Sequence, residues 1–210
     1  MNRIRSRCLC IFSLSLLSIQ GGTGELPKIS PAQPFTFVVL GDNRGDDSGQ
    51  QPFAFKAVLD SVKAQAPVLI LDSGDMIYGH TSNARRMREQ WRIYRKAIAK
   101  IHIPIFHVPG NHDLWNEPSA DFYRTLWGPT YYAFSFGNSR FIGLDTETIT
   151  GQIEGEQFQW LQKQLIECSD TNIFLFMHRP LFPVDGGIGS SLDKYPGKRD
   201  RLHDLFVQHR

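Results

Sequence analysis

The amino-acid sequence predicts an α/β domain in which a largely parallel or mixed central β-structure is flanked by helices. Short apolar runs typical of buried strands alternate along the chain with amphipathic helical segments. Of the 210 residues, 41% are hydrophobic and 21% are charged, as in ordinary globular proteins. This composition excludes a disordered chain, a collagen and a coiled coil.

The first half of the chain is expected to contain three buried strands separated by two helices. Apolar runs typical of such strands occur at residues 35–40, 67–71 and 103–108. Two series of apolar residues recur at the spacing of one helix face: Phe55, Val58, Leu59, Val62 and Ala66 behind Pro52, and Met87, Trp91, Tyr94, Ile98 and Ile101. This strand–helix–strand order favours parallel pairing.

The second half is expected to add a hairpin, another strand and two helices. Residues 131–136 and 139–144 alternate around Gly137–Asn138, which is a hairpin signal, and residues 172–177 form a further apolar run. The helices are marked by Phe158, Leu161, Leu165 and Cys168, and by Leu202, Leu205 and Phe206. Residues 183–197 are rich in Gly, Ser and Pro, and we expect an irregular substrate loop or a solvated connection.

Residues 1–24 have the pattern of a secretory signal peptide. Arg3, Arg5 and Arg7 form a basic start, and residues 8–19 are uncharged. This apolar stretch is shorter than the roughly 20 residues that span a bilayer. We therefore expect a cleaved leader, a secreted or periplasmic product, and no membrane span in the mature chain. A mis-assigned start codon and an N-terminal membrane anchor are the alternatives.

Charge outside the leader is nearly balanced. The whole sequence has 23 basic and 21 acidic residues, and removal of the leader's three arginines leaves one more acidic residue than basic ones. We therefore expect no nucleic-acid partner. The Pro-rich residues 25–34 are expected to be a linker into a domain over residues 35–210. Beyond the leader the sequence keeps only Cys168, so the fold does not rely on an internal disulfide.

Polar side chains follow the predicted strands at the points where the strands end. Asp42 and Asp75 each come after a glycine, Asn111 follows the third strand, and His178 follows the last one. Each motif alone is typical of a turn or a solvated histidine. Because ligands of α/β sheets bind beyond the carboxyl ends of strands, we expect these side chains to meet. Two carboxylates, an amide oxygen and an imidazole suit divalent or trivalent metals of intermediate hardness.

The motifs GD, GDMIY, GNHD and the final His resemble those of the calcineurin-like metallophosphoesterases, and GDMIY resembles the purple acid phosphatase branch. The stretches GPTYYAFSFGNSRFIGLDTE and EQFQWL are similar to the family's middle strands and following helix. The resemblance covers residues 35–182. It implies a metallophosphoesterase-like α/β sandwich and hydrolysis of phosphate monoesters by a metal-dependent phosphatase that acts on a small phosphorylated substrate.

The resemblance also implies a binuclear metal centre containing Fe, Mn or Zn. In the family's pattern Asp42 binds the first metal and Asp75 bridges the two ions. Asn111 and His178 bind the second metal. Tyr78 matches a ligand of the first metal in the purple acid phosphatase branch; a packing aromatic is the alternative.

His112 matches the family's candidate general acid, with Asp113 placed to orient its ring. A purely structural histidine is the alternative. Arg44 stands where many relatives carry a histidine, and a guanidinium does not ligate metals. We expect Arg44 either to hold a phosphate oxygen of the substrate or to form a surface salt bridge.

The resemblance further implies a closing GHxH motif whose two histidines each complete one metal, and this sequence contains none. His203 and His209 do not replace it, because they face different ways on one predicted helix. We therefore expect a chain that is incomplete at its C-terminus and lacks the last strands. The alternatives are a non-catalytic metal- or phosphate-binding remnant, and a phosphodiesterase or nucleotidase of the same family.

Four further polar residues near the predicted motifs have no definite role. His107 lies within a predicted strand and is expected to pack there. Asp145 and Glu147 follow the hairpin and lie either behind the ligands or at the surface. His80 has no role in the motifs.

Overall fold

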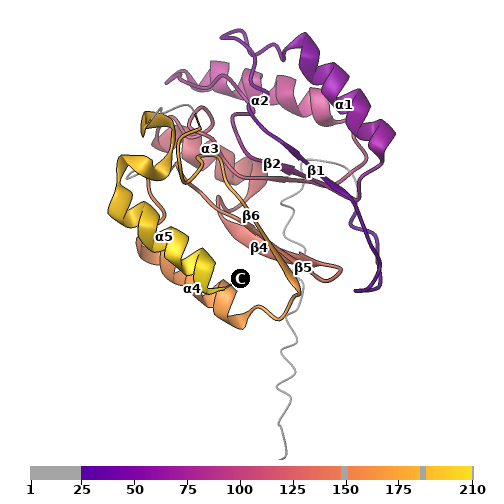
Figure 1. Cartoon of the computed structure of the whole chain (residues 1–210). Coiled ribbons are helices and arrows are strands. Elements are labelled where there is room, and N and C mark those ends of the chain that lie inside the picture. Colours follow the sequence, from indigo (N-terminus) through magenta and orange to yellow (C-terminus); the bar gives the residue numbers. More distant parts are fainter. Residues whose placement is uncertain (1–24, 148–150, 185–187, 210) are drawn as a thin grey trace, which may run out of the picture.

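The computed structural model describes residues 25–147, 151–184 and 188–209, so the predicted signal peptide lies outside the described residues. Within the described part, six strands form two three-stranded sheets, ordered β1-β2-β3 and β4-β5-β6. Figure 1 shows α1 and α2 on one outer side, α4 and α5 on the opposite side, and the sheets between them. The predicted α/β sandwich is confirmed, with its strands divided between two sheets.

The first sheet is entirely parallel. Strands β1 (Phe37–Leu40), β2 (Leu69–Asp72) and β3 (Ile105–His107) are joined by α1 (Phe53–Gln65) and α2 (Ala84–Ile98). Leu40 and His107 both pair with Asp72, so the three strands end in register. Their carboxyl ends therefore deliver three loops to one edge of the sheet.

Alternation along β2 explains why the first sheet is buried on both faces. Ile70 packs into the cluster formed with α1 and α2, where Trp91 and Tyr94 are fully buried. Leu69 and Leu71 point the other way, into the layer between the sheets. Because successive side chains of a strand face opposite sides, a strand covered on both faces is continuously apolar.

The second sheet combines the predicted hairpin with a parallel strand. Strands β4 (Tyr132–Phe136) and β5 (Ser139–Gly143) are antiparallel, and β6 (Asn172–Phe176) pairs in parallel with β5. The helices α4 (Gly155–Glu167) and α5 (Pro196–Gln208) pack on its outer face around Ile142 and Leu144.

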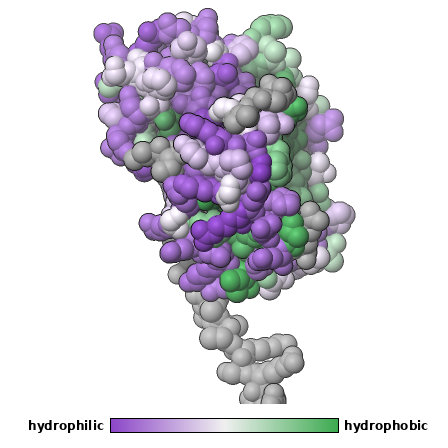
Figure 2. Space-filling view, turned by 60° about the vertical axis from the view of Figure 1, so that its left-hand side comes forward, coloured by the Kyte–Doolittle hydropathy of each residue, from purple (hydrophilic) through white to green (hydrophobic). Residues whose placement is uncertain are grey.

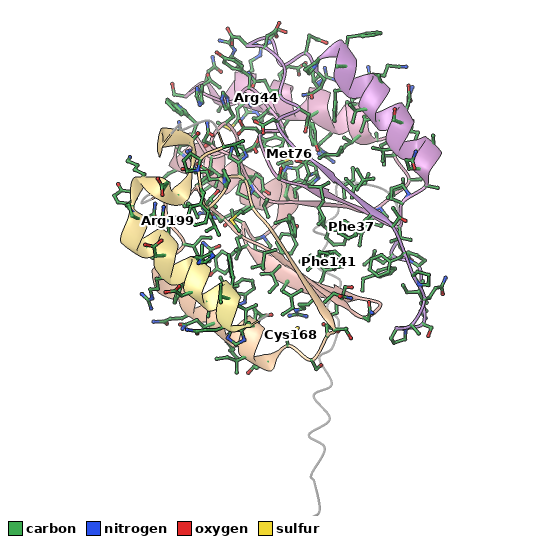
Figure 3. The ribbon with its side chains drawn as sticks, viewed as in Figure 1. Phe37, Arg44, Met76, Phe141, Cys168 and Arg199 are labelled. Atoms are coloured by element: carbon green, nitrogen blue, oxygen red, sulfur yellow. The ribbon has the colours of Figure 1, made fainter. Side chains whose placement is uncertain are left out.

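Aromatic rings fill the layer between the two sheets. The Phe141 side chain is fully buried there, and its ring lies 5.3 Å from that of Phe37 on the first sheet. Figure 3 labels both residues in this layer. On the face shown in Figure 2, by contrast, hydrophilic residues predominate and hydrophobic ones form separate patches. No helix of the described residues is long and apolar enough to cross a bilayer.

Three segments differ from the elements expected from the sequence. Helix α3 (Glu117–Trp127) was not expected, although Asn116 and Ser119 form a capping box at its start. Residues 183–197 are not irregular throughout, because they contain the 3-10 helices η1 (Ile188–Ser190) and η2 (Leu192–Lys194) and the first two residues of α5. In the segment expected to be a linker, Leu26 and Ile29 pack against the layer between the sheets.

Candidate metal centre and active site

The loops at the carboxyl ends of β1, β2, β3 and β6 converge on one site. Figure 3 labels Arg44 and Met76, which belong to the loops after β1 and β2. Asp42, Asp75 and His178 each offer a ligand atom, and these atoms all lie within 4.8 Å of one another. The structure therefore brings His178 to two aspartates that lie more than 100 positions before it in the sequence.

The contacts of His178 select the nitrogen that is available to a metal. Its Nδ1 lies 3.0 Å from the carbonyl oxygen of Ser73, which only accepts hydrogen bonds, so Nδ1 carries the proton. The other ring nitrogen, Nε2, faces Asn111 Oδ1 at 3.1 Å and Asp75 Oδ1 at 3.5 Å. Either a proton on Nε2 or a metal ion in this position brings the three groups together. The chemistry of the donor set therefore fits a bound metal of intermediate hardness.

The backbone of the two aspartates is unusual. Asp42 has φ 52° and Asp75 has φ 59°, the left-handed region that residues other than glycine rarely adopt. The N–H of Asp42 donates to the carbonyl of Gly74 at 2.9 Å, so the two loops support each other. A Cβ at Gly74 would approach Gly110 N to 2.4 Å, which explains why glycine precedes Asp75. Strained backbone of this kind concentrates at functional sites.

Arg44 lies between the two carboxylates. Its Nη1 is 2.8 Å from Asp42 Oδ1 and 2.8 Å from Asp75 Oδ2. Arg44 thus forms the salt bridge that was one of the two expectations. Its partners are two candidate metal ligands, Asp42 and Asp75, and Asp75 is buried. Binding of a substrate phosphate by Arg44 stays a prediction. The Asp42 side chain is 67% exposed and that of Asp75 only 2%, so the site opens to solvent on the Asp42 side.

His112 lies directly beside Asp75. Its backbone N–H donates to Asp75 Oδ1 at 3.0 Å, and its Nε2 is 3.9 Å from Asp75 Oδ2. Its Nδ1 makes a short contact with the carbonyl oxygen of Tyr78. The expectation that Asp113 orients this ring is wrong, because the Tyr78 carbonyl holds it.

Asp113 is fully buried and joins two loops of the site. Its carboxylate accepts hydrogen bonds from the backbone N–H groups of Gly110, Asp75, Met76 and Ile77, at 2.8–3.3 Å. Burial raises the pKa of Asp113 well above its ordinary value, and the hydrogen bonds from Gly110 and Asp75 oppose this rise. Asp113 therefore positions the GDMIY loop instead of acting on His112.

Tyr78 belongs to an aromatic group on the open side of the site. Its ring centroid lies 5.7 Å from that of His112 and 6.2 Å from that of His80. The His80 ring stacks on His112, a contact that the sequence motifs do not indicate. Partial removal from water and the neighbouring His112 lower the pKa of His80. The role of Tyr78 as a metal ligand stays a prediction.

The structure also places several residues to which the sequence motifs assigned no definite role. Glu147 lies behind the site, where its carboxylate pairs with Arg179 Nε at 2.7 Å and Nη2 at 2.8 Å. Asp145 is buried, and burial raises its pKa. His107 packs in the core against Trp127, as expected. His203 lies on α5 against Phe182, away from the metal-binding group.

Replacement of Asp113 by Ala is expected to lower the free energy of unfolding by at least about 3 kcal/mol, because buried N–H groups of two loops lose their acceptor. Urea unfolding followed by tryptophan fluorescence measures the change. Asp121→Ala is the matched control: Asp121 is exposed on α3 and pairs with Arg124, so a change within about 0.5 kcal/mol is expected. Equal effects of the two substitutions would show that Asp113 does not hold the loops.

Replacement of Arg44 by Gln is expected to tighten Mn²⁺ binding by about 2- to 5-fold, because the guanidinium competes with a cation for Asp42 and Asp75. Titration calorimetry of the metal-free chain gives the Kd. Arg86→Gln is the control, since Arg86 binds the backbone carbonyl of Asp47 and touches neither acid of the site. Weaker Mn²⁺ binding in Arg44→Gln would mean that Arg44 supports the centre.

Comparison with known proteins agrees with this geometry. A family model described as calcineurin-like phosphoesterase matches residues 29–205. A probable glycerophosphodiester phosphodiesterase of Arcobacter nitrofigilis is 29% identical over 152 residues, which cover 68% of this chain and 52% of the relative. The serine/threonine-protein phosphatase CPPED1 of Rattus norvegicus is 28% identical over 159 residues, covering 67% of this chain and 50% of the relative. The chain thus spans about half the length of these relatives.

Two solved structures share the fold at 15% sequence identity. A purple acid phosphatase from yellow lupin superimposes with a TM-score of 0.58, covering 76% of this chain and 33% of that chain. A dimetal phosphatase from Danio rerio gives a TM-score of 0.60 and covers 83% of this chain and 78% of that chain. Together with the converging ligands, the match of the family model over most of the sequence shows that this chain belongs to the calcineurin-like phosphoesterase family.

Proposed function

We propose that this chain hydrolyses phosphate monoesters at a metal centre in the converging loops. The observation that carries the proposal is the environment of His178 Nε2, which lies beside oxygens of Asn111 and Asp75. Asp42, Asp75, Tyr78, Asn111 and His178 would hold one or two ions of Fe, Mn or Zn. When bound, such ions activate water and neutralise the charge that develops on the phosphoryl group.

His112 is the proposed proton donor to the leaving group. The Tyr78 carbonyl accepts from Nδ1, so Nε2 is the nitrogen left for proton transfer. Nε2 faces the Asp75 carboxylate, and 13% of the His112 side chain remains exposed to solvent. The backbone bond from His112 to Asp75 keeps this nitrogen beside the metal-binding side chains.

Arg44 is the proposed substrate-binding residue. Its guanidinium is fixed between Asp42 and Asp75, at the open side of the site. A planar guanidinium presents several N–H donors in a geometry that suits phosphate oxygens. If a metal displaces Arg44 from the carboxylates, the positive charge of the Arg44 guanidinium stays next to the position of the phosphoryl group.

Phosphodiester hydrolysis is the second candidate. One relative is named as a probable glycerophosphodiester phosphodiesterase, and another, from Synechococcus, as a probable cyclic nucleotide phosphodiesterase. Rates with p-nitrophenyl phosphate and bis(p-nitrophenyl) phosphate separate the two reactions. Faster turnover of the monoester is the expected result, and turnover of the diester alone would replace the proposal with the second candidate.

Asp75→Asn is expected to lower kcat/KM for p-nitrophenyl phosphate by about 100-fold or more, because the buried carboxylate lies next to Arg44, His112 and His178. The assay uses metal-free protein reloaded with Mn²⁺ or Zn²⁺. Asp60→Asn is the control, since Asp60 is an exposed carboxylate on α1 that pairs with Lys56. Turnover that survives Asp75→Asn unchanged, or a wild-type chain that binds metal without any turnover, would contradict the proposed reaction.

A further inference from the structure

A row of aromatic rings leads from the site to the surface. The imidazole of His80 lies on that of His112 with ring centroids 3.9 Å apart and an interplanar angle of 5°. The Trp115 indole lies 4.2 Å from the His80 ring, at 36°. Two rings this close cannot share one face of an imidazole, so His80 lies between His112 and Trp115.

The outer end of this row is exposed to water. Trp115 is 52% exposed, and His80 is also exposed. Trp115 belongs to the short segment between His112 and the start of α3, so its position is tied to the site. Exposed aromatic surface beside a functional site is typical of ligand-binding positions.

The backbone at His80 is held in an unfavourable conformation. His80 has φ 47°, and Gly79 has φ 60°. A Cβ at Gly79 would lie 1.7 Å from the carbonyl oxygen of His112, so the two segments are in close contact. The N–H of Gly79 also donates to the buried Gln90 Oε1 at 2.9 Å. The stack of His80 on His112 is therefore built by strained and anchored backbone, which is typical of functional positions.

We propose that His80 and Trp115 bind the leaving group of the substrate, and that the chain prefers phosphate esters with an aromatic leaving group. This inference rests on the proposed function. There, the leaving-group oxygen meets His112, so the atoms attached to that oxygen lie beside the same ring stack. Because His112 and Trp115 cover the two faces of His80, a flat aromatic group meets the edge of His80 and the exposed surface of Trp115. An aliphatic group makes smaller and less specific contacts there.

The first test compares two esters in the wild type and two variants. The measured quantity is kcat/KM for phenyl phosphate divided by kcat/KM for glycerol phosphate, so that general losses of activity cancel. Trp115→Ala is expected to lower this ratio by about 3- to 10-fold, and Trp115→Phe is expected to retain most of it. Trp160→Phe is the control, because Trp160 lies on α4 and packs against Tyr131. Equal losses for both esters in Trp115→Ala would overturn the inference.

The second test does not depend on turnover. Phenylphosphonate and methylphosphonate are not esters, and their Kd values for the Mn²⁺-loaded chain report aromatic recognition alone. Tighter binding of phenylphosphonate that is lost in Trp115→Ala would support the inference even if no ester were hydrolysed, in which case the proposed function would fail separately. Equal binding of the two phosphonates by the wild type would overturn the inference while leaving the proposed hydrolysis intact.

Discussion

The site depends on one buried carboxylate that joins two loops. Asp113 accepts hydrogen bonds from Gly110 in its own loop and from residues 75–77 in the loop after β2. These bonds fix the peptide planes on both sides of Asp75, whose left-handed backbone would otherwise be unfavourable. They thereby hold Asp75 in its position beside Arg44, His112 and His178.

The rest of the fold serves to bring these loops to one edge. Because β1, β2 and β3 are parallel and end in register, their following residues meet without long connections. The aromatic layer around Phe141 holds the second sheet against the first, and β6 of that sheet delivers His178. The position of His178 therefore depends on the packing between the two sheets. This dependence links the stability of the core to the geometry of the site.

The sequence predicted which side chains meet at the strand ends, because strand periodicity determines which residues follow each strand, and the structure brings Asp42, Asp75 and His178 together. It did not indicate what the carboxylate of Asp113 contacts: neighbours in sequence suggested His112, but the turn directs the side chain inward to backbone donors. The sequence motifs also did not predict the stack of His80 on His112, because this stack depends on left-handed backbone at residues 79 and 80. Helix α3 was missed although its capping box is local.

The central claim is that the strand ends form a metal centre around Asp75 and His178. Anomalous diffraction from crystals grown with Mn²⁺ tests it most directly. The account predicts an anomalous peak at about 2.0–2.3 Å from an oxygen of Asp75 and from Nε2 of His178, as expected for metal–ligand bonds. An ordered site with Asp75 and His178 in place, but without a peak between them, would contradict it.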